Sequence, residues 1–404
     1  MIVKSLHLEN FRNYRRLDIE VGPSVNVFYG KNAQGKTNII EALYLCASVR
    51  SHRTSKDKEI IMKGQDYFKA KLLFCPDDQC HLSESVSLCY HYDQNEEKGI
   101  KKNTRIAKYN GVKLDRIAEY FGLFNAVIFA PEDLLLIKEG PSVRRRFIDI
   151  LISQVRPRYF YDLQQYSRFL MQRNRLLKQL RASSMLQNSP EDISMRIEAW
   201  DLCMAPFAAE IIKTRALFLE RLKHHAAHFH HMISDGQEEL KLHYKTVSGV
   251  MTSSENNDLD QIEKLLLSKW KESHKEDIEK GNTSIGPHRD DIEMSLNDLP
   301  IRLYASQGQQ RTSALSLKLS ELMIVREETR EMPVLLLDDV FSELDINRRT
   351  ALLKSIGNAQ VFITCTDRSF IEKELCPICP DLFEKKDNIR FFRILEGQAY
   401  LDAD

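Results

Sequence analysis

The sequence predicts an α/β fold, in which a head with a mixed sheet and flanking helices carries an inserted helical arm. Three observations predict this fold. An apolar strand at residues 25–29 runs into a glycine-rich loop and then into a helix. A second apolar strand, residues 334–337, ends in two aspartates. Between them, apolar residues from position 159 onward alternate at steps of four and three, which is typical of packed helices.

Length and composition limit the possible classes of protein. The chain has 404 residues, more than one hydrophobic core usually holds, so we expect two structural units. A composition of 43% apolar and 29% charged residues excludes a disordered or collagen-like chain. Lysine plus arginine and aspartate plus glutamate each number 58, so binding to a polyanion requires a local basic cluster. The sequence lacks a signal-peptide pattern and any uncharged apolar run of membrane-spanning length, so we expect a cytoplasmic protein.

The N-terminal part contains a candidate phosphate-binding loop. Residues 2–8, 17–21 and 25–29 are predicted strands of one sheet, and "YGKNAQGKTNIIEALYL" follows. Glycines let the backbone wind around phosphate oxygens, and the helix dipole adds partial positive charge there. Lys36 is predicted to reach the β and γ phosphates of ATP, and the Thr37 hydroxyl is predicted to bind Mg²⁺. The predicted ATP-binding loop comprises Gly30, Lys31, Asn32, Ala33, Gln34, Gly35, Lys36 and Thr37.

The carboxylate for the metal is predicted far along the chain. The stretch "MPVLLLDDVFSELD" indicates a buried parallel strand that delivers Asp338 and Asp339 at its carboxyl end. Asp338 is the candidate Mg²⁺ ligand, and it lies 302 residues after Lys36 (338 − 36). Nearly the whole chain is therefore inserted between two halves of one site.

A second anion-binding helix start precedes the acidic strand. Ser306, Gln307, Gly308 and Gln309 lead into a helix with Leu315, Leu319, Leu322 and Met323 on one face. One nucleotide site needs only one such helix start. The second start is best explained if it reaches the nucleotide held by another copy of the protein.

The middle of the chain is predicted to form an antiparallel pair of helices. The apolar steps run through Tyr159, Leu163, Tyr166, Leu170, Leu177 and Leu180, and Arg173 interrupts them. A turn at "SSMLQNSP" separates them from a second helix, from Pro190 to about Ile233. We therefore predict a two-lobed head from residues 1–138 with 236–404, and an arm domain at 139–235.

Two basic clusters are candidate DNA-binding surfaces. Ten Lys or Arg residues and two acids lie between Arg144 and Arg181, a local net charge of +8. The densest point is Arg144, Arg145 and Arg146, although these arginines could instead pair with acids of the head and hold the arm in place. The second cluster, from Lys98 to Lys108, indicates a basic hairpin with Lys101, Lys102 and Arg105.

Metal-binding alternatives are weak. The histidines His224, His225, His228, His230 and His231 lack a completing carboxylate or cysteine, so we interpret them as a polar helix face. Cys376 and Cys379 form a single CxxC without a second pair at zinc-ribbon spacing.

Taken together, these motifs resemble a known family. The order of glycine loop, "SQGQ", "VLLLDD" and "SELD" resembles an ABC-type P-loop ATPase head of the chromosome-maintenance and recombination class. "LENFRNY" and "IGPHRDD" make the chain similar to the bacterial RecF family. The resemblance implies ATP-driven homodimerisation on duplex or gapped DNA without strong sequence specificity, with slow, DNA-stimulated hydrolysis as a switch. It also implies a place at the nucleoid, RecR and RecO as partners, and help in loading RecA at single-strand gaps.

The resemblance also implies roles for individual residues. It makes Lys36, Asp339 and Ser306 the catalytic set, with Asp339 in place of the glutamate that polarises the attacking water in many ABC ATPases. Ser306 and Gly308 would contact the γ phosphate of the opposite protomer. Asp345 belongs to the loop along the dimer seam, and Thr366 takes the place of the switch histidine.

Three residues near the loop have less certain assignments, and other classes of protein compete with this one. Glu132 in "APEDLLL" is the stand-in for the usual lobe-joining glutamine, whereas Arg12 and Asn13 either contact the nucleotide or form a solvated turn. One alternative is a short-armed structural-maintenance ATPase that acts on DNA ends or chromosomes. The other is a nucleotide-binding subunit of a transporter, which has no use for a basic arm.

Overall fold

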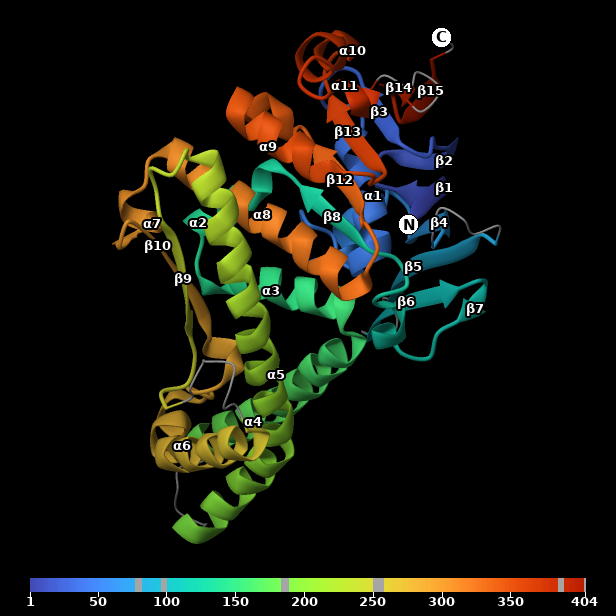
Figure 1. The fold of residues 1–404 in the computed structure, drawn as a ribbon. Coiled ribbons are helices and arrows are strands. Elements are labelled where there is room, and N and C mark those ends of the chain that lie inside the picture. The colour runs from blue at the N-terminus through green and yellow to red at the C-terminus, as the bar shows by residue number, and fades with distance from the viewer. Residues whose placement is uncertain (77–81, 96–99, 183–188, 250–257, 384–388, 403–404) are drawn as a thin grey trace.

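The computed structural model describes residues 1–76, 82–95, 100–182, 189–249, 258–383 and 389–402. The head contains two six-stranded sheets, with the helix after the glycine loop between them (Figure 1). That helix, α1 (Lys36–Ser48), contacts strands of both sheets, because its residues are buried on almost every side. The glycine loop, which precedes α1, therefore lies where the two six-stranded sheets meet.

The first sheet is antiparallel throughout, in the order β2-β1-β4-β5-β6-β7. Its strands alternate buried and exposed residues, as expected when one face packs on the core. The strands are β1 (Ile2–Phe11), β2 (Tyr14–Glu20), β4 (Tyr67–Cys75), β5 (Glu84–Asn95), β6 (Ile100–Tyr109) and β7 (Val112–Lys113).

The second sheet holds both predicted apolar strands. Its order is β15-β14-β3-β13-β12-β8, and all strands except β15 run parallel. The strands are β3 (Val25–Tyr29), β8 (Ala126–Phe129), β12 (Val334–Asp338), β13 (Val361–Cys365), β14 (Ile389–Leu395) and β15 (Gln398–Leu401). One prediction was wrong: β1 and β2 do not share a sheet with β3. Their alternating pattern suits a half-exposed antiparallel sheet, whereas β3 is buried on both faces.

A third, three-stranded sheet, β11-β10-β9, lies beside the helices and away from the two head sheets (Figure 1). It comprises β9 (Leu240–Lys245), β10 (Asp291–Leu296) and β11 (Leu299–Pro300). The remaining helices are α2 (Leu135–Lys138), α3 (Pro141–Val155), α4 (Pro157–Ala182), α5 (Pro190–Ile233), α6 (Leu259–Lys280), α7 (Ile301–Tyr304), α8 (Gln307–Thr329), α9 (Ile346–Ile356), α10 (Arg368–Phe370) and α11 (Pro380–Phe383).

The arm contains the two predicted helices, α4 and α5, which pack against each other. They differ in length, at 26 and 44 residues, because α5 continues from the arm into the head and packs on α8. A third helix, α6, packs on both. The turn predicted between α4 and α5 falls on residues 183–188, outside the described residues, and the division into domains stays a prediction.

Arg173 joins these three helices and does not merely interrupt the apolar pattern. Its fully buried side chain donates to Asp201 of α5 at 2.6 Å and to Asp277 of α6 at 2.7 Å. A buried charge requires such partners, because desolvating an unpaired guanidinium is costly. The arm therefore has a polar centre within an apolar helix pair.

Candidate nucleotide-binding site

The glycine loop lies between β3 and α1, where the sequence predicts it. Gly30 and Gly35 have positive φ angles of 142° and 117°. A Cβ atom at Gly30 would lie 2.6 Å from the main-chain oxygen of Ile394, and one at Gly35 would lie 2.6 Å from Asn13 Nδ2. Both positions therefore require glycine, for conformation and for space.

The Lys36 ammonium lies across the loop. Its Nζ donates to the main-chain oxygens of Gly30 at 2.5 Å and Lys31 at 3.0 Å. Burial lowers the pKa of Lys36, and the neighbouring Asp339, Cys365 and Asp338 oppose that effect. A cation held by carbonyl oxygens inside a glycine loop can exchange those weak partners for phosphate oxygens.

The two distant halves of the predicted metal site meet. Thr37 Oγ1 donates to Asp338 Oδ1 at 3.0 Å, a contact between residues 301 positions apart. Thr364 of the neighbouring strand donates to the same oxygen at 2.7 Å and accepts a hydrogen bond from the main-chain N–H of Asp339 at 2.8 Å. The sequence analysis missed Thr364, although its position at the end of a buried strand could have indicated it.

The electrostatics of Asp338 suit a cation. Burial raises the pKa of Asp338, the hydroxyls of Thr364 and Thr37 lower it, and the carboxylates of Glu132 and Asp339 raise it. Carboxylate and hydroxyl oxygens are the hard ligands that Mg²⁺ prefers. Thr37 and Asp338 therefore fit Mg²⁺, the ion that the sequence predicts them to bind.

Glu132 lies in the turn Pro131–Leu134, close enough to Asp338 for its charge to raise the pKa of that aspartate. Its Oε2 atom is buried and has no hydrogen-bond partner among the described residues. The next residue, Asp133, lies 4.0 Å from the buried ammonium of Lys318 on α8, which also pairs with Glu321. Burial raises the pKa of Asp133 to about 7. The turn therefore connects the metal-binding edge with α8.

Arg12 and Asn13 lie beside the loop. Arg12 donates from Nε at 2.8 Å and from Nη2 at 2.6 Å to the buried carboxylate of Glu41 on α1. Asn13 donates to the main-chain oxygen of Gln34 at 2.9 Å. The Gln34 side chain in turn accepts from the main-chain N–H of Glu396, in the turn between β14 and β15, at 2.8 Å. These contacts fix the shape of the loop, and direct contact of Arg12 or Asn13 with the nucleotide stays a prediction.

The predicted second helix start is the N-terminus of α8. Ser306 caps the helix: its Oγ accepts from the Gln309 N–H at 3.2 Å, and its own N–H donates to Gln309 Oε1 at 2.7 Å. Ser306 and Gln307 are exposed. Within the described residues, no hydrogen bond or ion pair joins the segment 306–309 to the glycine loop. The two helix starts that the sequence predicts to bind anions are thus both present and separate.

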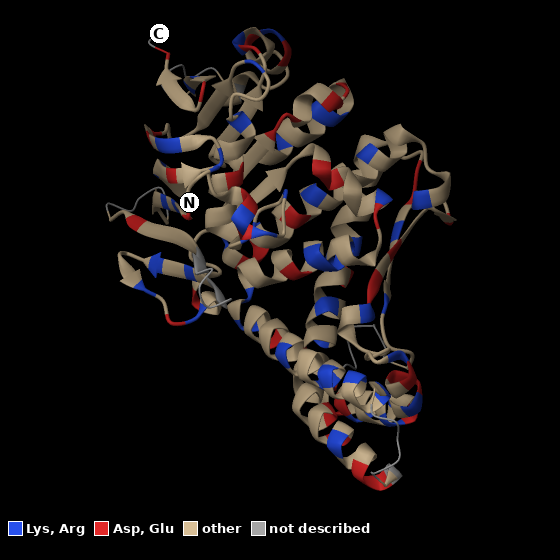
Figure 2. Cartoon of the chain, turned by 180° about the vertical axis from the view of Figure 1, so that it is seen from behind, with Lys and Arg blue, Asp and Glu red and all other residues tan. Residues whose placement is uncertain are grey.

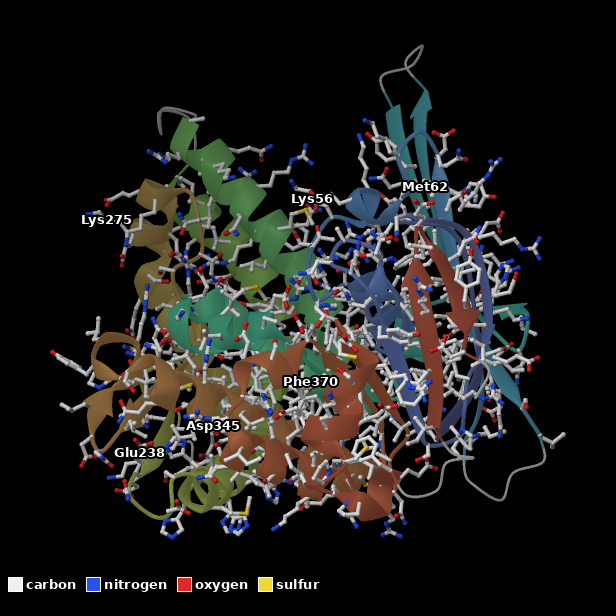
Figure 3. All side chains as sticks on the ribbon, turned by 90° about the horizontal axis from the view of Figure 1, so that it is seen from above. Lys56, Met62, Glu238, Lys275, Asp345 and Phe370 are labelled. Carbon is white, nitrogen blue, oxygen red and sulfur yellow. The ribbon has the colours of Figure 1, made fainter. Side chains whose placement is uncertain are left out.

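The "SELD" loop lies against this helix start. Asp345 caps α9 and pairs with Arg348, which donates to the main-chain oxygen of Gly308 at 2.9 Å. Asp345 and Glu238, which accepts from Gln309 at 2.8 Å, lie on the same side of the molecule (Figure 3). Thr366 is exposed just after β13, and Asp339 adopts a left-handed conformation with φ of 50°.

The arginines predicted to bind DNA make contacts within the chain. Arg144 is buried and donates to both carboxylate oxygens of Asp291, at 2.7 and 2.9 Å. Arg145 donates to the main-chain oxygen of Asp290 at 2.6 Å, and Arg146 donates to that of Ser51. These contacts support the alternative, in which the three arginines join the arm to the head, and DNA contact by them stays a prediction.

The basic hairpin is formed by β5 and β6, as predicted. Arg105 pairs with Asp57, whose carboxylate balances the charge of the Arg105 guanidinium. Lys101 and Lys102 lie in β6, and their side chains are outside the described set. Figure 2 shows acidic and basic residues side by side along the arm helices, so the local excess of positive charge is not a uniform stripe.

Neither a metal-binding cluster nor a membrane-spanning helix is found in the part of the chain that the structure describes. His225 pairs with Glu327 at 3.0 Å and His230 with Glu238 at 2.9 Å, and no group of three or more His, Cys, Asp or Glu is placed to hold a metal ion among these residues. Within the same residues, no helix is both long enough and apolar enough to cross a membrane.

The fold and the site together define a class of protein. A glycine loop with Lys36 and Thr37, a remote acidic strand that reaches it and a separate helix that starts at the signature, Ser306–Gln309, constitute an ABC-type ATPase head, here with a helical arm. The sequence matches the RecF/RecN/SMC N terminal domain family over residues 2–379.

Comparison with known proteins gives the particular family. The DNA replication and repair protein RecF of Acetivibrio thermocellus is 43% identical over 403 residues, which cover 99% of this chain and 100% of that protein. RecF of Ruminiclostridium cellulolyticum is 40% identical over 400 residues, 99% of each chain. A solved structure of the recombination mediator RecF with ATP, in the RecFOR pathway, is 37% identical with a TM-score of 0.85 and covers 100% of this chain and 98% of that one. The chain belongs to the RecF family.

Proposed function

We propose that this protein is an ATP-dependent DNA-binding protein of recombinational repair and replication-fork maintenance, which dimerises when it binds ATP. The observation that carries the proposal is the contact between Thr37 and Asp338, which assembles one half of a composite ATPase site. The exposed start of α8 supplies the capping hydroxyl and the free helix N-terminus of the other half. Two copies in opposite orientation complete two sites.

Each residue has a defined task in this proposal. The loop from Gly30 to Thr37 binds the triphosphate, and Lys36 exchanges its carbonyl partners for phosphate oxygens. Thr37 and Asp338 hold Mg²⁺, which supplies positive charge at the phosphates when bound. Ser306 and Gly308 of the second copy donate to the γ phosphate and close the site.

Asp339 favours a slow switch over a motor. Its carboxylate is one methylene shorter than a glutamate, so it orients an attacking water less well. Hydrolysis then serves to open the dimer, and DNA bound to the closed dimer stimulates it. The RecF of the solved ATP-bound structure is described as a recombination mediator in the RecFOR pathway. We extend that placement to RecR and RecO as partners, to RecA loading at gaps and to a position at the nucleoid in the cytoplasm.

The first prediction tests the composite site. Ser306→Arg places a large cation where the second copy's phosphate is to be received, so we expect normal ATP affinity of the monomer and no ATP-dependent dimer. Titration with a fluorescent ATP analogue and light scattering on the same sample measure the two quantities. Ser268→Arg, at an exposed position on α6, is the matched control. A variant that still dimerises, or one that loses ATP affinity, contradicts a signature that acts on the second copy.

A further inference from the structure

Large apolar side chains are exposed beside the start of α8. Leu299, Leu303 and Tyr304 are 54%, 72% and 65% exposed, and all three fall within six consecutive residues. Ile346, next to Asp345, is 58% exposed. We call these four residues the signature-edge patch. Clustered exposed apolar residues of this size commonly mark an interaction surface.

The patch is held in place by the fold. Ile301, in the same short helix as Leu303 and Tyr304, is buried, and α7 packs on β10, β11 and α2. Tyr304 is separated from the capping residue Ser306 by Ala305 alone. The side chains of Leu303 and Tyr304 are therefore presented to solvent by an anchored segment that leads directly into the signature.

Ile346 lies on a second element that adjoins the signature. Arg348 pairs with Asp345 and donates to the main-chain oxygen of Gly308 at 2.9 Å and to Thr312 Oγ1 at 2.7 Å. These bonds hold the start of α9 against the start of α8. Exposed apolar side chains thus lie on two elements that adjoin the polar segment from Ser306 to Gly308, as in interfaces where apolar anchors accompany a polar contact.

The position of the patch indicates which molecule packs against it. Tyr304 adjoins Ser306 in sequence, and Arg348 holds the helix that begins at Ile346 near the same segment, so a molecule that brings a phosphate to Ser306 also comes close to the patch. In the proposed function that phosphate belongs to ATP in the glycine loop of a second copy. We infer that the signature-edge patch packs against the second copy in the ATP-bound dimer, and that Leu303 and Tyr304 supply a large part of the dimer's affinity. This inference rests on the proposed function.

The test removes the apolar side chains and leaves the signature intact. For the double variant Leu303→Ser, Tyr304→Ser we expect ATP affinity of the monomer and the thermal midpoint to match wild type. We expect the ATP-dependent dimer to dissociate at least about tenfold more readily, since buried aromatic and aliphatic anchors commonly carry that much affinity. Analytical ultracentrifugation across a concentration series with ATP measures the dissociation constant.

A matched control removes equally exposed apolar residues elsewhere. Met195 and Leu202 on α5 are 68% and 60% exposed, and Met195→Ser, Leu202→Ser should dimerise like wild type. A Leu303, Tyr304 double variant that dimerises as tightly as wild type overturns the inference and leaves the proposed function standing. A wild-type protein that stays monomeric with ATP overturns the proposed function itself.

A mixing experiment asks whether the patch acts at the composite site. Lys36→Met lacks a working glycine loop but keeps its patch, whereas the double variant keeps its loop. A mixed dimer has one complete site, made from the loop of the double variant and the patch of Lys36→Met. We expect the mixture to associate with ATP more than either protein alone, as a mixture of Lys36→Met with Ser306→Arg also should. Recovery in the Ser306→Arg mixture alone overturns placement of the patch at the composite site.

Discussion

At the scale of single residues, the contacts of Asp338 show how its carboxylate is oriented for the predicted cation. Two hydroxyls, from Thr37 and Thr364, donate to one of its oxygens, and their hydrogen bonds oppose the rise in pKa that burial causes. The Thr37 hydroxyl and the Asp338 carboxylate are thereby already oriented toward one point. Preorganisation of this kind reduces the reorganisation needed when ATP and Mg²⁺ bind.

Lys36 is the residue whose loss should be least tolerated. Lys36→Met keeps the length of the side chain and removes the charge that faces the β and γ phosphates, so we expect ATP binding to fall by at least about a hundredfold, or close to 3 kcal/mol. Lys31→Met, in the same loop, is the control for a general loss of positive charge. Equilibrium binding of a fluorescent ATP analogue measures both. Wild-type affinity in Lys36→Met would rule out this loop as the phosphate-binding site.

At the scale of elements, the turn Pro131–Leu134 and helix α8 form one buried electrostatic unit. A single ammonium, Lys318, faces two carboxylates, Glu321 within its own helix and Asp133 in the turn, and it is closer to Glu321. The negative charge of Asp133 is thus only partly balanced by Lys318, which agrees with a pKa of Asp133 raised by burial to about 7. Because α8 begins at Ser306, this unit places the signature helix and the metal-facing turn in direct contact.

The raised pKa predicts a pH dependence of stability. The folded state holds a proton on Asp133 more tightly than the unfolded state, whose carboxyl has the ordinary pKa of 3.8. The stabilising contribution is therefore complete below about pH 4 and is lost as the pH rises toward 7. We expect Asp133→Asn to lose less stability than wild type across this interval. Urea unfolding at several pH values measures the slopes, with the exposed Asp115→Asn as control, and parallel slopes for all three proteins would refute the prediction.

Elements defined by local pattern could be predicted from the sequence, and long-range pairings could not. The glycine loop, β12, the start of α8 and the two arm helices follow from periodicity and capping residues. Alternation in β1 indicated a strand, but nothing local specified that its sheet differs from that of β3. Arg173 resembled a defect because its partners Asp201 and Asp277 lie on other helices. The contact between Thr37 and Asp338 was predictable because each residue lies in a motif that is recognisable alone.

At the scale of the whole molecule, arginines join the arm to the head. Arg215 of α5 is buried and donates to Asp149 of α3 at 2.9 Å and to Asp290 at 2.8 Å. Arg144 extends the same junction to Asp291 at the start of β10. The "IGPHRDD" segment thus serves as a polar joint between arm root and third sheet, and this accounts for part of the +8 charge that the sequence analysis assigned to DNA contact.

The last prediction distinguishes arginines that join the arm to the head from basic residues that contact DNA. Replacing Arg144, Arg145 and Arg146 by alanine removes the guanidinium that donates to both carboxylate oxygens of the largely buried Asp291, so we expect the free energy of unfolding to fall by about 3 kcal/mol or more, with loss of ATPase activity. The comparison is a triple variant of equal charge, Arg168→Ala, Arg175→Ala and Lys178→Ala, on the exposed face of α4. These three exposed residues form no ion pair with the described part of the chain, so stability should be unchanged.

The same two triple variants also test where DNA binds. If the exposed face of α4 contacts phosphates, the second triple variant lowers the slope of log K against log salt by about 2 to 3, at about 0.9 per contact. Thermal unfolding, basal ATPase and salt-dependent DNA binding are measured on one preparation of each protein. A stable, active Arg144–146 variant with a reduced salt slope would show that these arginines contact DNA after all, because a structural joint cannot lose its charges without loss of stability.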